Sequence, residues 1–75
     1  MLIVDSGPSY ADRYTLVNDD GACFGFGSNP FHPQGFGQYV GDLGQAVSVE
    51  YLETQEEIEL KDLPEQAQRF VQERL

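Results

Sequence analysis

The single histidine of this 75-residue chain, His32, lies between Phe31 and Pro33 in a glycine-rich stretch. Imidazole is the side chain whose ordinary pKa lies nearest neutral pH, so His32 is the first candidate for a general base or a hydrogen-bonding anchor. A small molecule bound beside the neighbouring glycine turns would use this group. A structural role, in which His32 fixes the conformation of the stretch, explains the same residues, and both hypotheses stay open.

The other residues with chemical potential have structural explanations. A single cysteine, Cys23, excludes an internal disulfide and a cysteine-based zinc site, and no cation adjoins it in the sequence to lower its pKa. The run Asn18-Asp19-Asp20-Gly21 resembles a fragment of a calcium loop, but it lacks the spacing and the terminal glutamate of an EF-hand. A hairpin turn accounts for it. We therefore predict no catalytic residue, no metal and no cofactor, and a protein that is not an enzyme.

The glycines between residues 25 and 41 do not form a nucleotide-binding pattern. There is no G-x-G-x-x-G motif between a strand and a helix, and Lys61, the only lysine, is not part of a phosphate-binding loop. The formal charge of -9 argues against direct binding to a nucleic acid or an anionic membrane surface, both of which require a basic face. The same charge favours a basic protein as partner.

The segment 25–44 combines many glycines, two prolines and several aromatic residues, and we predict that it is a long loop with a fixed conformation. Rigid aromatic side chains are typical anchors of protein interfaces. In loop 28–44 the predicted partner-binding residues are Phe31, His32, Gln34, Phe36 and Tyr39. The alternative is that these side chains fill the core of a protein too small to fill it otherwise.

A second candidate surface is a run of glutamates with no lysine or arginine among them: Glu50, Glu53, Glu56, Glu57 and Glu59. A solvated hairpin face is the simpler explanation. The alternative is an acidic surface that mimics a nucleic acid and occupies the basic face of a nuclease or DNA-binding protein, as inhibitors of the phage type do. Mutual repulsion between these unpaired glutamates costs stability, which gives the second hypothesis a physical motive.

Period-two patterns predict the strands that position these residues. Segments 13–17 and 22–26 read as a hairpin closed by Asp-Gly, with Phe24 and Phe26 on one face and Cys23 on the other. The short apolar run 2–4 adds a strand or packs as a staple. Segment 46–52 reads as a third strand, 53–56 as a turn and 57–61 as a fourth strand, although a helix through 50–59 is the alternative.

The C-terminal segment predicts a helix. Asp62 and Glu65 have the spacing of a capping box, and Pro64 suits the first turn. An apolar stripe follows at helical spacing, with Phe70 as its anchor: Leu63, Ala67, Phe70, Val71 and Leu75. The predicted fold is α+β, a small antiparallel sheet of about four strands in the order β-β-long loop-β-β-α, with the helix packed on it.

The length and composition predict one domain, residues 1–75. So short a chain has a marginal core, worth about 3–5 kcal/mol, and an obligate homodimer remains an open alternative. No apolar run approaches the ~20 residues needed to cross a bilayer, and no basic leader precedes the first apolar residues. With one cysteine, we expect a soluble, cytoplasmic protein.

Three motifs carry a resemblance to a known group of proteins. They are the run 12–15 (Asp-Arg-Tyr-Thr), the loop 29–39 that begins Asn-Pro-Phe-His-Pro-Gln-Gly-Phe-Gly, and the run 62–65 (Asp-Leu-Pro-Glu). The chain resembles short uncharacterised bacterial and phage proteins with an N-P-F-H-P-Q-G-F-G-type loop. The resemblance implies a natural small α+β domain and no particular activity. The sequence thus predicts a non-enzymatic interaction or regulatory protein that binds a protein partner through loop 28–44.

Overall fold

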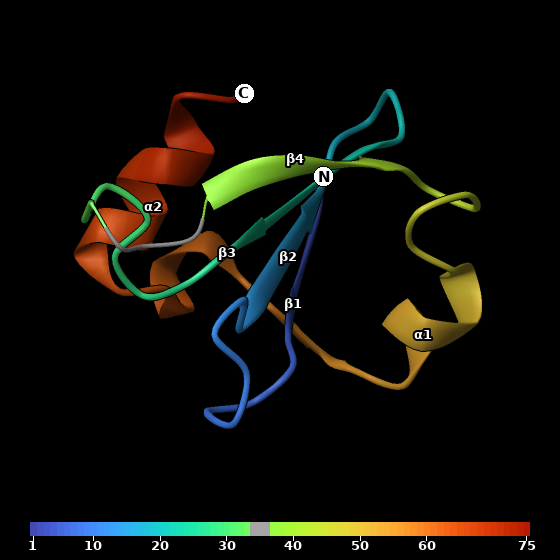
Figure 1. Ribbon diagram of the computed structural model, residues 1–75, viewed down its shortest axis with the longest axis horizontal. Helices are drawn as coiled ribbons and strands as arrows, with labels where there is room; N and C mark the ends of the chain where they lie inside the picture. The colour runs from blue at the N-terminus through green and yellow to red at the C-terminus, as the bar shows by residue number, and fades with distance from the viewer. Residues whose placement is uncertain (34–36) are drawn as a thin grey trace.

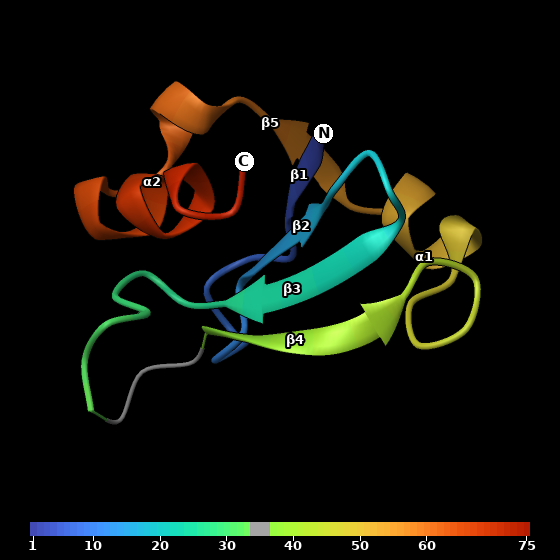
Figure 2. The same ribbon diagram turned by 90° about the horizontal axis from the view of Figure 1, so that it is seen from above.

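The computed structural model describes residues 1–33 and 37–75, and it is a small α+β fold (Figure 1). Five antiparallel strands form one sheet in the order β4-β3-β2-β1-β5, and Figure 2 shows β4 and β5 at its opposite edges. The strands are β1 Leu2–Asp5, β2 Tyr14–Val17, β3 Ala22–Phe26, β4 Gly37–Asp42 and β5 Glu56–Ile58. Helices α1 Val49–Glu53 and α2 Glu65–Gln72, with the 3-10 helix η1 Leu60–Asp62, complete the described fold.

The β2–β3 hairpin confirms the prediction from the Asp-Gly turn. Gly21 donates its N–H to the Asn18 carbonyl at 2.9 Å and has a φ of 89°, a conformation that glycine adopts without strain. The register pairs Tyr14 with Phe26 and Val17 with Cys23. Because side chains alternate across a strand, this register fixes which residues meet each helix.

The apolar run at the start of the chain forms a strand, which was one of the two predicted alternatives. This strand lies inside the sheet. Strand β1 pairs with β2 on one side and with β5 on the other. Ile3 and Val4 point to opposite faces, and both are buried. A strand that is apolar at successive positions is expected where both faces of the sheet are covered.

The larger part of the core lies between the sheet and α2. It contains Ile3, Tyr14, Leu16, Phe26, Leu63, Ala67, Phe70 and Val71, with Phe24 packed against it. The predicted apolar stripe of the helix and its anchor, Phe70, are therefore confirmed. Leu75 is an exception, because it lies beyond the end of α2 and is 69% exposed.

The opposite face of the sheet carries a second, smaller core under α1. Val4, Val17, Cys23 and Leu52 are buried there. Cys23 lies on the face opposite Phe26, as predicted, and burial raises the pKa of its thiol. This face is covered by little more than a five-residue helix, which leaves room for the pocket described below.

The predicted strand over 46–52 is wrong, because the chain forms helix α1 there. The Ser48 hydroxyl accepts the Tyr51 N–H at 3.1 Å and so caps the helix. Apolar residues at every second position imitate a strand, yet only Leu52 of the helix is buried. The alternative helix through 50–59 is also only partly correct, since α1 ends at Glu53 and β5 follows.

The predicted fourth strand, 57–61, and the predicted capping box of the last helix both require correction. Strand β5 is shorter and begins one residue earlier, and η1 follows it. Asp62 accepts the Glu59 N–H at 2.9 Å, so Asp62 belongs to the capping box of η1. Helix α2 begins at Glu65, after Pro64 in the N-cap position.

The predicted loop over 25–44 is also shorter than expected, because its second half contains β4. This strand pairs with β3 through a register irregularity between Cys23 and Phe24. Glycines at both sides of the strand disguised it in the sequence. With β1 and β4 present and the strand over 46–52 absent, the described sheet has one strand more than the four that the sequence predicted.

Candidate functional site

Phe31, the first predicted interface residue, packs on the exposed side of the larger core. Its ring meets the Phe70 ring edge to face, with centroids 6.2 Å apart. The Arg69 guanidinium carbon lies 4.3 Å from the centre of the Phe31 ring, within the range of a cation–π interaction. Phe31 nevertheless remains 40% exposed, so its ring is held in place and still presents a surface.

Tyr39 lies on β4 and is 55% exposed. Its ring meets the Phe24 ring edge to face at 5.6 Å, and its hydroxyl donates to Asp42 Oδ1 at 2.8 Å. This hydrogen bond raises the pKa of Tyr39, because the bond requires the protonated hydroxyl and the carboxylate repels a phenolate. Tyr39 is therefore oriented by two contacts within the molecule.

Arg74 connects these two aromatic residues. Its guanidinium carbon lies 3.4 Å from the centre of the Phe70 ring and 5.4 Å from that of Phe24. The contacts consequently form one continuous row from Tyr39 through Phe24, Arg74 and Phe70 to Phe31. Sequence reasoning missed this use of Arg74, although its position four residues after Phe70, just beyond the end of α2, was a usable signal.

The remaining members of the predicted loop surface are less informative. His32 is exposed, and its backbone N–H donates to the Asn29 carbonyl at 3.2 Å in a turn. Gln34 and Phe36 lie outside the described residues. The hypothesis of a small-molecule site at His32 stays a prediction.

The predicted acidic residues are exposed, but they do not form the hairpin that the sequence suggested. Glu50 and Glu53 lie on α1, and Glu56 and Glu57 lie on the edge strand β5. Glu59 precedes η1, and its carboxylate lies 3.3 Å from the Lys61 ammonium group. The predicted acidic hairpin does not form, because helix α1 lies where the strand over 46–52 was predicted.

An apolar pocket of about 330 Å³ lies between α1 and the sheet, and we call it the α1 pocket. Its walls come from β1, the segment before α1, α1 itself and β5. The residues that line it are Leu2, Val4, Leu43, Val49, Leu52, Glu53, Gln55 and Glu57. Among the described residues, Glu53 and Glu57 are the charged ones that line it, so a predominantly apolar recess carries negative charge.

The α1 pocket exists because the helix above it is too short to cover the sheet. Val49 is 46% exposed and Leu43 is 36% exposed, whereas Leu52 is buried beneath them. Sequence reasoning missed the pocket, because a strand over 46–52 would have given these side chains a different arrangement. The apolar character of residues 43, 49 and 52 was the available signal.

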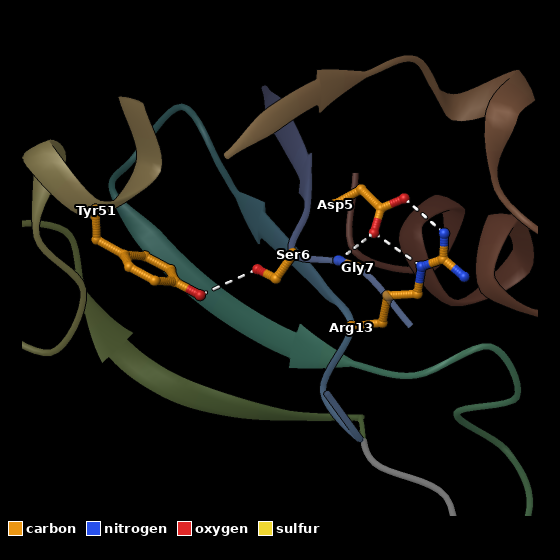
Figure 3. Close-up of polar contacts among 5 residues, drawn as sticks. All are labelled: Asp5, Ser6, Gly7, Arg13 and Tyr51. Atoms are coloured by element: carbon orange, nitrogen blue, oxygen red, sulfur yellow. Dashed lines mark hydrogen bonds and ion pairs between the residues drawn. The ribbon is translucent and has the colours of Figure 1, made fainter. Parts of the chain in front are cut away.

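Polar contacts around the β1–β2 connection tie α1 to the sheet (Figure 3). The Tyr51 hydroxyl and the Ser6 hydroxyl lie 3.0 Å apart and share a hydrogen bond. Next to Ser6, Asp5 accepts two hydrogen bonds from Arg13, at 2.8 and 2.9 Å, and one from the Gly7 N–H. These hydrogen bonds lower the pKa of the Asp5 carboxyl, and those from Arg13 have the largest effect.

Within the described part of the chain, no group of three or more histidine, cysteine, aspartate or glutamate side chains could hold a metal ion. Among the same residues, no helix is both long and apolar enough to cross a membrane. What the arrangement offers chemically is an apolar recess lined by two glutamates and, on the other face, a row of aromatic rings that is exposed at its two ends, Phe31 and Tyr39.

No model of a known family, no curated protein and no solved structure matches the chain. The resemblance to bacterial and phage proteins therefore stays a prediction.

Proposed function

We propose that the protein is a non-enzymatic interaction protein that binds a basic protein partner at the α1 pocket. The observation that carries this proposal is the position of Glu53 and Glu57, which come from two different elements and both border one apolar recess. Neither carboxylate forms an ion pair within the described residues.

The proposal follows from the different roles of apolar and charged residues in protein interfaces. A buried apolar anchor supplies most of the affinity, whereas charges at the rim steer the encounter and select the partner. A volume of about 330 Å³ lies near the lower end of the range for ligand pockets, about 300–1,000 Å³, so it suits one or two apolar side chains. A partner segment with an apolar residue flanked by lysine or arginine complements both features. Nucleases and DNA-binding proteins are basic partners of this kind.

The aromatic row on the α2 face supports a second candidate surface, the one that the sequence favoured. Phe31 is held by Arg69 and Phe70 while 40% of it remains exposed. A side chain that is already ordered loses less entropy on binding than a free one. We place this surface second, because its rings are largely engaged by contacts within the molecule.

An affinity capture from a bacterial extract distinguishes the two surfaces. We would compare the unmodified protein with a pocket variant, Glu53→Gln with Glu57→Gln, and an aromatic variant, Phe31→Ala with Tyr39→Ala. Each bait is first shown to be folded by circular dichroism. The capture is run at about 0.05 M and about 0.5 M salt, where the Debye length falls from roughly 14 Å to roughly 4 Å.

The proposal predicts a basic protein that the unmodified and aromatic baits retain at low salt and that the pocket variant loses. The captured partner is then purified, and its binding to the unmodified protein must weaken at high salt. A partner lost only with the aromatic variant would instead establish the α2-face surface. Retention of every captured protein by the pocket variant would reject the α1 pocket as the binding site.

A further inference from the structure

We propose that the partner segment binds in extended conformation, as an added strand along the outer edge of β5, with an apolar side chain in the α1 pocket. This inference rests on the function proposed above and specifies its mode. It combines an open sheet edge with the pocket that adjoins it.

Among the described residues, strand β5 is the last strand of the sheet and pairs on one side only, with β1. Within the described residues, no hydrogen bond outside that pairing involves the backbone of Glu56, Glu57 or Ile58. The outer edge of such a strand presents N–H and C=O groups that an extended chain can pair with. Figure 2 shows β5 at the border of the sheet, next to the connection that leads back to α1.

The pairing register of β5 places the pocket within reach of an added strand. Ile58 lies opposite Ile3 and packs against the core on the α2 side. Glu57 lies opposite Val4, on the other face, and both of these residues line the α1 pocket. Because side chains alternate across a strand, the residue of an added strand that faces Glu57 lies on the pocket side. Its neighbours two positions away lie on the same side.

The charge of β5 determines which strand can occupy this edge. If two copies of the chain paired through β5, Glu56 and Glu57 of one copy would approach those of the other, which is unfavourable. Charged side chains on an edge strand are a common protection against such self-pairing. A strand with lysine or arginine two positions before and after an apolar residue avoids the repulsion and adds opposite-charge pairs on the pocket side. The occupant is thus a basic extended segment of a partner protein.

The test uses a blocked synthetic peptide, acetyl-Thr-Lys-Thr-Leu-Thr-Lys-Thr-amide, in which both lysines and the leucine lie on one face of a strand. Variants replace the leucine with isoleucine, valine or phenylalanine. A matched peptide has glutamate in place of both lysines. Two further peptides carry N-methyl groups, either on the Lys and Leu amides or on the inner Thr amides. Binding is followed by two-dimensional NMR of the labelled protein.

Strand addition predicts that the lysine peptides shift the amide signals of β5 and of Val49 and Leu52, and that the glutamate peptide does not. Only one set of amides in a strand faces its neighbour, so one N-methylated peptide should lose at least about tenfold in affinity while the other binds normally. If both N-methylated peptides bind equally well and still shift Val49 and Leu52, the strand mode is wrong and the pocket function stands. If no lysine peptide binds better than its glutamate counterpart, both proposals fail.

Discussion

Glu53, the last residue of α1, and Glu57, the middle residue of β5, border the same apolar pocket from two different elements. The turn between α1 and β5 folds the glutamate-rich segment back so that two of its residues line one recess. A solvated acidic face would not require this convergence on apolar walls. The relationship between these two residues is therefore the basis of the proposed function.

We predict that Glu53→Gln with Glu57→Gln leaves stability unchanged or raises it by up to about 0.5 kcal/mol, since exposed charges without partners contribute little. Binding of a basic partner should fall in the same variant. Urea unfolding followed by circular dichroism measures the first effect. Glu65→Gln with Glu73→Gln, at the first residue of α2 and at the residue after its end, is the control for the lost charge, because neither residue lines the pocket. A destabilisation above about 1 kcal/mol would assign the two glutamates a structural role instead.

Local patterns were sufficient to predict part of this fold. The Asp20-Gly21 turn defines the β2–β3 hairpin from adjacent residues, and the helical spacing around Phe70 defines the apolar face of α2. In both cases the signal in the sequence and the contact in the structure lie close together along the chain. The class of fold followed from these elements.

The candidate site could not be predicted in the same way, because its parts meet only through distant contacts. A five-residue helix shows little periodicity, so α1 was mistaken for a strand, and its position depends on Leu52 packing with Val4 and Val17. The glycines around β4 hid a strand that the pairing of Tyr39 with Phe24 helps to define. Glu53 and Glu57 were singled out for their charge, but the apolar walls of the pocket that they line were not foreseen.

Phe70 joins the larger core to the aromatic row on the α2 face. Its ring packs with Phe26 at 4.9 Å and contacts Phe31 and Arg74. We predict that Phe70→Ala costs about 3–5 kcal/mol, which equals the whole stability expected of so small a core. The variant should be largely unfolded in near-ultraviolet circular dichroism and in NMR. Phe31→Ala, at a partly exposed position, should cost about 1 kcal/mol and stay folded; similar losses in both variants would contradict the described core.

Gly41 and Gly44 form a matched pair that tests the packing of the segment before α1. Both have a positive φ, of 136° and 91°, which L side chains rarely adopt. A Cβ at Gly41 would overlap with the Ala46 Cβ, whereas a Cβ at Gly44 meets nothing within 4 Å. Gly44→Ala should therefore cost about 1–2 kcal/mol, from backbone strain alone, and Gly41→Ala should cost clearly more. Equal losses in thermal or urea unfolding would show that Ala46 does not lie against Gly41.

The ion pair of Asp5 with Arg13 predicts a pH dependence of stability. Because the folded state lowers the pKa of Asp5 below its ordinary value of 3.8, the pair stabilises the fold above that pH. The contribution is lost as the pH falls through the lowered pKa. Asp5→Asn should thus cost about 1–2 kcal/mol at neutral pH, and the difference from the unmodified protein should shrink below about pH 4. Urea unfolding at several pH values checks this, and a difference that stays constant down to about pH 2 would contradict it.

The most direct test of the central claim is cross-linking from within the α1 pocket. A photoreactive benzophenone side chain replaces Val49, which lines the pocket and is 46% exposed, or, as a control, Tyr10, which is 59% exposed and does not line it. Each variant is irradiated in a bacterial extract at low and high salt, and the attached peptides are sequenced. The account predicts that Val49 alone yields peptides with an apolar residue flanked by lysine or arginine, and that high salt removes them. Equal products from both positions, or products from Val49 that are acidic or insensitive to salt, would contradict it.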